Sequence, residues 1–365
     1  MLSAADDYPI HQIAEPVRYV GTSDRNFYDR YYFNLHASSA ELFMVMGMGQ
    51  YPNLAVQDAF CLLRRGTEHR VVRASKELGD RMDTTVGPFR IEVLEPLHRL
   101  RFVLEPNEWG IAADLVWEGA IPAFEEPRHH IRLHGRVLFD TMRLAQTGCW
   151  SGILHVDGED IPVTPDRWKG TRDRSWGVRP VGEPEPAGIR ADQPLFFNLW
   201  NYAPMQFDDY SILYIVQEWA NGQRVMDEAV RVWADPTREP EWLGRPEHEL
   251  SIRPGTREVD SAVISFPQAP GGAFDVHVTH LLEAHIGIGT GYGFDADWRH
   301  GMWQGPLVVQ GVSLDVEADR ERFFGIVDCV ARFESSTGEV GYGLHEYLFL
   351  GPHEKYGFTS FMDVP

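Results

Sequence analysis

Many segments of the chain alternate apolar and polar residues with a period of two. In a β-strand successive side chains point to opposite faces, so this pattern covers a core on one face and meets solvent on the other. Turn-forming sequences such as Val156–Glu159 and Ala269–Gly272 separate these segments. The clearest alternating segments are Ile131–Phe139, Ser151–Val156, Ser211–Val216, Phe274–Thr279, Leu307–Leu314 and Cys329–Phe333. Many strands at this spacing predict an all-β sandwich or barrel.

Helical patterns are scarce. The segment Ser38–Met46 is the best candidate for a helix, although it could also be a strand. A chain of 365 residues is long for one domain, so two domains are expected. A segment rich in Pro, Gly and Glu divides the chain into similar halves. We predict an N-terminal β domain over 1–180, a linker over 181–194 and a C-terminal β domain over 195–365.

The two halves show a weak internal similarity in sequence. A hairpin-like unit comes near the end of each half, at Ile153–Glu159 and Ala331–Glu339, and a Gly followed by an aromatic-rich strand comes after it. Together with the linker, this similarity favours two copies of one β-architecture.

The net charge narrows the class of expected partner, and the cysteines indicate the redox compartment. A formal net charge of −21 repels phosphate backbones, so nucleic acid is not an expected partner. The N-terminus has no signal-peptide pattern, and no run of about 18 apolar residues is present, so we expect no membrane insertion and a cytoplasmic protein. Cys61, Cys149 and Cys329 are far apart, which favours three free thiols in a reducing compartment. The sequence leaves open whether the protein forms a homodimer.

Cofactor and metal signatures are missing from the sequence. Fifteen His occur, but neither His-Glu-x-x-His nor Cys-x-x-Cys is present, and Arg132 would stand between His130 and His134 on a strand. The glycines of 287–305 fit neither a P-loop nor a dinucleotide-binding turn, because no helix pattern follows them. We therefore expect no metal and no cofactor.

The segment Arg172–Gly177, with the sequence Arg-Asp-Arg-Ser-Trp-Gly, is the most informative motif. On a strand, one face carries Asp173, Ser175 and Gly177, and the other carries Arg172, Arg174 and Trp176. Asp173 is a candidate acid or base if it is buried, and otherwise the partner of an Arg in a structural network. Arg172, Arg174 and Trp176 are candidates for binding a flat ligand.

Three further segments supply candidates. Alternation after the linker places Asn198, Trp200 and Tyr202 on one face, which suits either an aromatic core or a pocket for a hydrophobic ligand. The glycine-rich region contains Tyr292, Trp303 and His300, the last a proton shuttle or a structural His. The last aromatic strand contains Tyr342 and Glu346. Burial would raise the pKa of Glu346 and make it an acid, whereas an Arg partner would keep it ionised.

The Asp-x-x-Trp-Gly core at Asp173–Gly177, the tandem β halves and the Gly-rich aromatic segments resemble the AttH-like and carotenoid hydratase-like lipocalin superfamily, which includes hydroxyneurosporene synthase. Fungal Diels–Alderases and tocopherol cyclase look like more distant relatives. The resemblance implies two tandem lipocalin-like antiparallel β-barrel domains with a hydrophobic pocket inside or between them. It also implies cofactor-independent acid–base chemistry or shape-directed cyclisation on an apolar substrate.

The family signature carries over only in part. Asp173 and Trp176 match its Asp and Trp, but Arg174 stands where the hydratases have His. The hydratases also use a Tyr-x-Asp in the following strand. Tyr202 can stand for that Tyr, whereas Pro204 occupies the Asp position. The pocket can therefore be inherited while the reaction has changed.

Two functions remain open from the sequence. The first is an enzyme of the lyase, hydratase, isomerase or cyclase class acting on a hydrophobic small molecule, with Asp173, Glu346 and His300 as candidate catalytic groups. The second is a non-catalytic binder or carrier of such a molecule. The residues expected to bind the ligand are Arg172, Arg174, Trp176, Asn198, Trp200, Tyr202, Tyr292, Trp303 and Tyr342.

Overall fold

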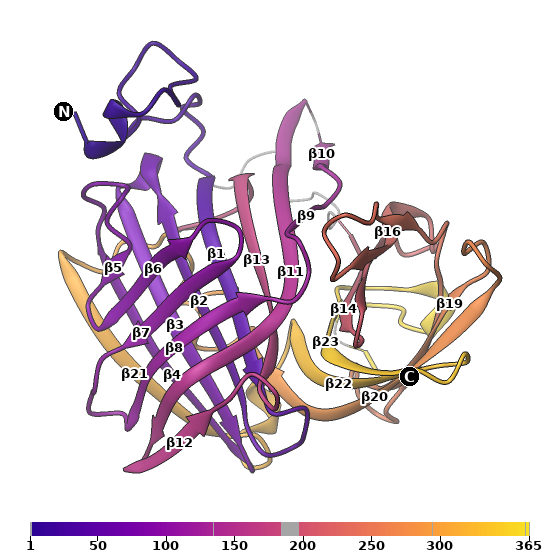
Figure 1. Cartoon of the computed structure of the whole chain (residues 1–365). Helices are drawn as coiled ribbons and strands as arrows, with labels where there is room; N and C mark the ends of the chain where they lie inside the picture. The colour runs from indigo at the N-terminus through magenta and orange to yellow at the C-terminus, as the bar shows by residue number, and fades with distance from the viewer. Residues whose placement is uncertain (1, 134, 184–196, 294, 362, 365) are drawn as a thin grey trace.

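The computed structural model of the chain describes residues 2–133, 135–183, 197–293, 295–361 and 363–364. In these residues the strands form two curled antiparallel sheets, one of 14 strands and one of 9 (Figure 1). The prediction of an all-β fold built from two lipocalin-like barrel units is confirmed. Most of the predicted linker, from residue 184 onward, lies outside the described residues.

The first sheet contains almost the whole N-terminal half. Its main strands, in order across the sheet, are β21 (Leu307–Asp315), β4 (Glu68–Glu77), β3 (Val56–Arg65), β2 (Phe43–Tyr51), β1 (Phe27–His36), β13 (Lys169–Val178), β11 (Arg136–Val156), β8 (Ile111–Gly119), β7 (Arg99–Leu104), β6 (Phe89–Glu95) and β5 (Thr85–Val86). Three short strands pair with β11, namely β9 (Phe124–Glu125), β10 (His129–Leu133) and β12 (Glu159–Val163).

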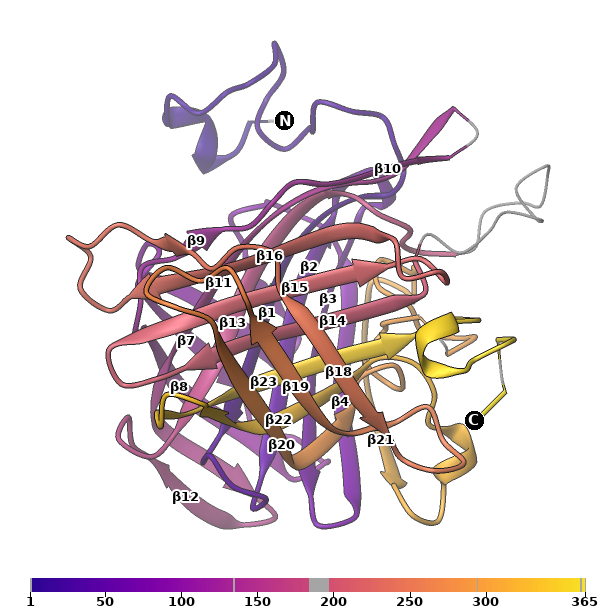
Figure 2. The same cartoon turned by 90° about the vertical axis from the view of Figure 1, so that its right-hand side faces the viewer.

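The second sheet is built from the C-terminal half (Figure 2). Its strands, in order, are β17 (Glu241–Trp242), β16 (Arg224–Trp233), β15 (Tyr210–Glu218), β14 (Leu199–Gln206), β23 (Val340–Phe349), β22 (Val327–Ser335), β20 (Phe274–His285), β19 (Val259–Phe266) and β18 (Glu247–Ile252). Short 3-10 turns occur at η1 (Ala4–Asp7), η2 (Pro52–Leu54), η4 (Arg320–Arg322) and η5 (Glu354–Tyr356). Among the described residues, no helix is long and apolar enough to cross a membrane.

One strand of the C-terminal half belongs to the first sheet. Strand β21 pairs along its whole length with β4, from Leu307 opposite Lys76 to Asp315 opposite Glu68. In Figure 1 it appears as an orange strand beside the indigo strands of the N-terminal half. The chain therefore returns to the first sheet between β20 and β22, and the two halves are interleaved.

Three layers of apolar side chains hold the fold together. One fills the interior of the first sheet around Phe33, Trp117 and Trp150, and a second fills the interior of the second sheet around Tyr214 and Phe333. A third layer lies between the sheets. It joins Tyr32, Phe43, Val45, Phe60, Leu62 and Val71 of the first sheet to Tyr202, Ile215, Leu282, Ala284, Val330 and Leu344 of the second. The outer face of β1–β4 is thus covered rather than solvated.

This covering explains why the sequence left one segment open between a helix and a strand. Part of Ser38–Met46, the best helix candidate, begins strand β2 (Phe43–Tyr51) instead of a helix. Every residue of β2 is buried, because one face meets the N-terminal core and the other meets the second sheet. A strand buried on both faces has no polar face, so its apolar run cannot be told from a buried helix by periodicity.

Candidate active site

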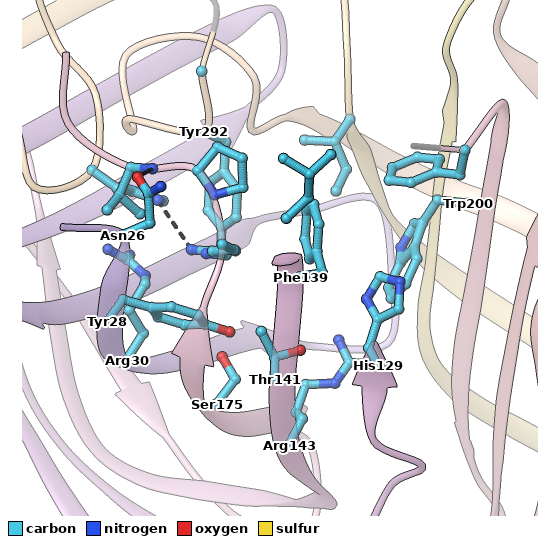
Figure 3. Close-up of a pocket in the computed structure, with 18 of the residues that line it drawn as sticks. Asn26, Tyr28, Arg30, His129, Phe139, Thr141, Arg143, Ser175, Trp200 and Tyr292 are labelled. Carbon is cyan, nitrogen blue, oxygen red and sulfur yellow. Dashed lines mark hydrogen bonds between the residues drawn. The ribbon is translucent and has the colours of Figure 1, made fainter. Parts of the chain in front are cut away.

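A cavity of about 610 Å³ lies between the two sheets (Figure 3). Its walls come from β1, β11 and β13 of the first sheet, from β14, β15 and β23 of the second, and from the loop 286–306. It is therefore formed on the outer face of the first barrel and not in its lumen, which the N-terminal core fills. The lining combines aromatic and aliphatic side chains with a few polar groups, as in sites for small hydrophobic ligands.

Alternation along β1 sends one set of side chains into the cavity. Tyr28, Arg30 and Tyr32 line it, whereas Tyr31 and Phe33 point into the N-terminal core. The neighbouring strand β13 is in register with β1, with Asp173 opposite Tyr32 and Ser175 opposite Arg30. Asp173 and Ser175 consequently enter the same cavity, as the period-two pattern of the motif predicts for one face.

The carboxyl group of Asp173 is half-buried and opens onto the cavity. Its carboxylate makes no hydrogen bond or ion pair with any other residue in the described part of the chain. Burial raises the pKa of Asp173 from 3.8 to about 7, with Arg143 acting in the opposite direction and Glu126 and Glu346 adding to the rise. At neutral pH this group can therefore both give and take a proton.

A second acidic group is a pair of carboxyls on adjacent strands, of which one, Glu346, lines the cavity. Asp328 of β22 and Glu346 of β23 are direct cross-strand partners, and both are buried. Burial raises the pKa of both, and for Asp328 the neighbouring Glu346 raises it further. Because two such close carboxyls cannot both ionise easily, the pair resists losing its last proton.

Hydrogen bonds fix this pair from both sheets. The phenol of Tyr32 donates to Asp328 Oδ2 at 2.5 Å, and the indole Nε1 of Trp200 donates to Glu346 Oε1 at 2.5 Å. The amide of Asn34 in turn donates to the Tyr32 oxygen at 3.3 Å. The acidic pair is therefore oriented by β1 on one side and by β14 on the other.

Arg143 of β11 places a cation beside these acids. It forms an ion pair with the buried Glu126, and its guanidinium lies 4.5 Å from the ring centre of Tyr202 and 5.3 Å from that of Trp200. Burial alone would lower the pKa of Arg143, but the carboxylate of Glu126 more than offsets this and raises it. Arg143 thus stays charged and limits how far the pKa of Asp173 rises.

Arg30 is held rigidly in the opposite wall. It donates to Tyr51 and, at 2.9 Å, to the buried Asp58, whose second oxygen accepts from the Gly301 amide at 2.8 Å. Two glycines of β2 leave space for it: a Cβ at Gly47 would lie 2.9 Å from Arg30 Nη2, and one at Gly49 would lie 2.7 Å from Nη1. These close approaches explain why glycine interrupts an otherwise bulky strand.

His300 contributes a neutral imidazole. Its Nε2 lies 3.1 Å from the Thr290 carbonyl, which can only accept, so Nε2 carries the proton. Its Nδ1 faces Arg179 Nη2 at 3.4 Å and is therefore an acceptor. Burial, together with Arg30 and Arg179, lowers the pKa of His300 well below its ordinary value. The ring stays neutral near pH 7, which favours the structural role over the proton shuttle, the two alternatives that the sequence left open.

The structure brings together five of the residues named from the sequence. Asp173, Glu346, His300, Trp200 and Tyr292 all line the cavity. Seven others lie outside its wall, namely Arg172, Arg174, Trp176, Asn198, Tyr202, Trp303 and Tyr342.

These seven side chains have other surroundings. Arg172 donates to Gln146, Arg174 forms an ion pair with Asp29, and Asn198 donates to the Leu350 carbonyl. Trp176 and Trp303 are exposed. Tyr202 packs beneath Arg143, and Tyr342 lies near Lys169.

Several important residues were missed from the sequence. Tyr32, Glu126, Arg143 and Asp328 have no motif around them, and they converge only when the two sheets pack. Asp328 offered one signal, since it is an acidic residue within the apolar strand Val327–Ser335. A polar residue on a strand face expected to be buried is the kind of exception that marks a site.

The sequence was also compared with known families and structures. One family model matches residues 2–359, almost the whole chain. The chain belongs to DUF8625, a family of unknown function. A search of curated protein sequences finds no match to it.

Solved structures share its architecture. An AttH-assigned protein from Nitrosomonas europaea aligns with a TM-score of 0.56 and 14% identity, covering 93% of this chain and 98% of that one. Kievitone hydratase from Nectria haematococca aligns with a TM-score of 0.53 and 13% identity, covering 91% and 93%. CghA, solved with Sch210972, aligns with a TM-score of 0.50 and 12% identity, covering 89% of each chain. This member of DUF8625 therefore has the fold of the AttH-like, hydratase-like lipocalin superfamily that the sequence motif indicated.

Proposed function

We propose that the protein is a cofactor-independent enzyme that binds a hydrophobic small molecule between its two sheets and acts on it by proton transfer. The observation that carries this proposal is the carboxyl of Asp173, which has no hydrogen-bond or ion-pair partner among the described residues and opens onto the cavity with a pKa raised to about 7. A carboxyl poised near the working pH is what general acid–base catalysis requires. A simple carrier gains nothing from a half-buried carboxyl without a partner.

The cavity also supports the substrate class. Tyr28, Tyr292 and Trp200 present aromatic side chains to it, and Leu348 and Met226 add aliphatic surface. A volume of about 610 Å³ suits a terpenoid, a polyketide, a steroid or an aromatic molecule of drug-like size. Aromatic faces also stabilise positive charge, which develops when an alkene is protonated.

The reaction that fits best is addition or elimination of water, or an isomerisation or cyclisation begun by the same proton. In hydration, protonated Asp173 gives its proton to one alkene carbon, forming a C–H bond. Water then forms a C–O bond at the neighbouring carbon, and its surplus proton returns to the Asp173 carboxylate. The pair Asp328–Glu346, in which both pKa values are raised, supplies a second acid through Glu346, which lines the same cavity. The name of kievitone hydratase, a protein of this fold, supports water addition among these reactions.

Turnover of a panel of hydrophobic alkenes, alcohols and polyenes tests this function. Mass spectrometry of the products separates gain of water, loss of water and isomerisation. We expect Asp173→Asn to lower kcat by roughly 10²–10⁴-fold while the substrate still binds. Asp114→Asn is a matched control, since this carboxylate lies in an exposed ion pair with Arg101. Binding of panel members without turnover by the wild type would favour the carrier function instead.

A further inference from the structure

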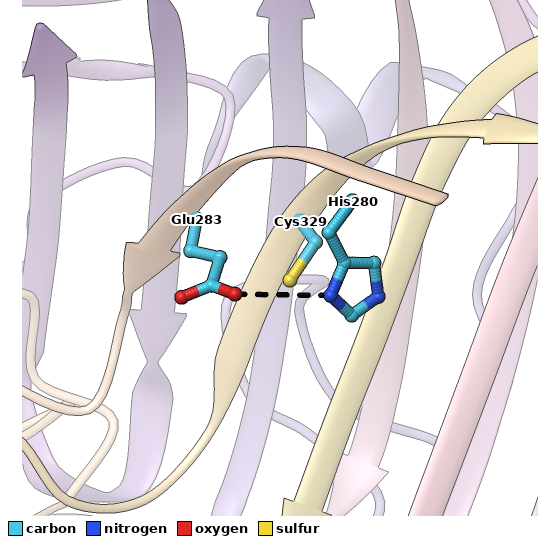
Figure 4. A group of neighbouring side chains, drawn as sticks. All are labelled: His280, Glu283 and Cys329. Carbon is cyan, nitrogen blue, oxygen red and sulfur yellow. Dashed lines mark ion pairs between the residues drawn. The ribbon is translucent and has the colours of Figure 1, made fainter. Parts of the chain in front are cut away.

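A second cluster of reactive side chains lies on the other face of β22. His280 and Glu283 of β20 and Cys329 of β22 each offer one atom, and these three atoms all lie within 4.8 Å of one another (Figure 4). Along β22, Asp328 points toward the first sheet, where it accepts a hydrogen bond from Tyr32, whereas Cys329 packs in the interior of the second sheet. The proposed proton transfer uses none of these three residues.

A bulge in β20 creates the cluster. In a regular strand, residues three apart point to opposite faces, so His280 and Glu283 would be separated. Here the register with β22 shifts between His280, opposite Ala331, and Leu282, opposite Val330. The extra residue reverses the alternation, so Glu283 comes opposite Cys329 on the face that His280 occupies. Bulges commonly re-aim side chains at functional positions.

A chain of hydrogen bonds fixes the tautomer of His280. The amide nitrogen of Asn201 donates to the Tyr214 oxygen, so its Oδ1 is left to accept from His345 Nε2 at 2.8 Å. Since Nε2 of a neutral His345 carries its proton, Nδ1 accepts, and His280 Nε2 donates to it at 2.7 Å. The lone pair of a neutral His280 therefore lies on Nδ1.

That lone pair is aimed at two other electron-rich groups. His280 Nδ1 lies 3.8 Å from Glu283 Oε1 and has no hydrogen-bond partner in the part of the chain that the structure describes. The His280 side chain is 5% exposed, so water does not solvate this nitrogen freely. One divalent cation placed between these atoms would satisfy the imidazole lone pair, the Glu283 carboxylate and the Cys329 sulfur together.

We propose that His280, Glu283 and Cys329 bind a zinc-class divalent ion. Imidazole, carboxylate and thiolate are all zinc ligands, and three protein ligands with one open position make up a typical non-structural zinc site. Bond lengths of about 2.0–2.3 Å place tetrahedral ligand atoms roughly 3.3–3.7 Å apart. The distances between these atoms, at most 4.8 Å, therefore need to shorten by no more than about 1.5 Å. The His280–His345–Asn201 chain is the outer hydrogen bonding that zinc-bound His residues show.

The surroundings permit the ion to enter. Glu283 is 19% exposed on its side chain, whereas Cys329 is fully buried, so the solvent route passes the carboxylate. Arg253 Nη2 already donates to Glu283 Oε1 at 2.9 Å and Arg253 Nη1 to Glu258 at 2.6 Å. A carboxylate has about four lone-pair sites, so Glu283 can hold both the guanidinium and an ion. Binding releases the proton of the Cys329 thiol to solvent, which makes the affinity rise with pH.

Cobalt substitution tests the site directly. The full-length protein is treated with a chelator, checked for its circular dichroism spectrum and titrated with Co²⁺. We expect one Co²⁺ per chain, with a thiolate-to-cobalt charge-transfer band and the strong visible bands of tetrahedral cobalt. Added Zn²⁺ should then displace Co²⁺ and abolish the charge-transfer band and the visible bands. Absence of the charge-transfer band in the folded wild type would overturn the proposal.

Two variants and a control assign the ligands. Cys329→Ser should lose the charge-transfer band, and Glu283→Gln, at the more exposed side of the cluster, should weaken Co²⁺ binding by at least about 10-fold. Cys61→Ser is the matched control, because Cys61 is equally buried but lies in the N-terminal core. A band that survives in Cys329→Ser or disappears in a folded Cys61→Ser contradicts the assignment. In addition, Zn²⁺ should raise the Tm of the wild type and not of Glu283→Gln.

Discussion

Tyr32 of β1 donates a 2.5 Å hydrogen bond to Asp328 of β22, across the boundary between the two sheets. The two residues lie 296 positions apart in the sequence. Asp328 is in turn the cross-strand partner of Glu346, which lines the cavity. One phenol therefore connects the packing of the two halves to the protonation of the candidate active site.

Tyr32→Phe is expected to destabilise the protein by about 1–3 kcal/mol, because it leaves the buried Asp328 without its donor. The same change raises the pKa of Asp328, since this hydrogen bond favours the ionised form. Urea unfolding measures the first effect. Tyr31→Phe is the matched control, because the adjacent phenol points into the N-terminal core and makes no hydrogen bond in the described residues. Equal midpoints for the two variants would contradict the role assigned to Tyr32.

Asp173 should make stability depend on pH in a defined direction. Burial raises its pKa from 3.8 to about 7, so between these values the folded chain keeps a proton that the unfolded chain has lost. The free energy of unfolding therefore falls as pH rises through this window and is constant above it. Asp173→Asn should gain on the order of 2 kcal/mol over the wild type at about pH 8 and nothing at about pH 3. Asp114→Asn should instead lower the free energy of unfolding at neutral pH, because Arg101 lowers the pKa of Asp114.

The pH profile of turnover should identify the titrating group. With Asp173 acting as an acid, kcat/KM falls as pH rises through about 7, and with Asp173 acting as a base it rises there. His300→Gln should keep this limb even if its rate is lower, since the pKa of His300 lies far below neutrality. Loss of the limb in His300→Gln and its persistence in Asp173→Asn would transfer the role to the imidazole.

The sequence predicted the fold well because alternation survives wherever a strand has one covered face. Strand β19 shows this pattern, and its segment was expected to belong to a β domain. The sequence left the segment that begins β2 open between a helix and a strand, because both faces of β2 are buried. The same reasoning placed Asp173 and Ser175 on one face, and Arg172 and Arg174 on the other. It could not show which face meets the second sheet, so the arginines became ligand candidates although they lie outside the cavity.

The remaining site residues depend on contacts between distant parts of the chain. Asp328, Arg143 and Tyr32 acquire their roles only when two sheets approach, and no local pattern encodes that approach. The cluster of His280, Glu283 and Cys329 was missed for a different reason. Its ligands come from a bulged strand and its neighbour, so their spacing matches no linear metal motif.

Gly47→Ala should destabilise the wall of the cavity that holds Arg30. A Cβ at this position would lie 2.5 Å from the ring of Phe60 and 2.9 Å from Arg30 Nη2. Both groups are buried and the ring cannot move freely, so we expect a loss of about 1–3 kcal/mol in urea unfolding. Gly79→Ala is the control, since a Cβ there meets no atom within 4 Å. A Gly47→Ala protein as stable as Gly79→Ala would show that Arg30 is not tightly confined.

The N-terminal half should not be stable by itself, although the predicted boundary near residue 180 suggests an independent domain. A fragment ending at Glu183 lacks β21, so the full length of β4 becomes an exposed edge with unpaired backbone groups. It also exposes Phe43, Val45 and Leu62, which the second sheet otherwise covers. We expect aggregation of this fragment in size-exclusion chromatography.

Joining the segment 307–315 to the end of the fragment through a glycine-rich linker should reduce aggregation, because the edge of β4 is paired again. The same segment with Val309 and Val312 both changed to Pro removes two strand amides and is the matched control. A monomeric, cooperatively unfolding 1–183 fragment would show that β21 is dispensable for the first sheet.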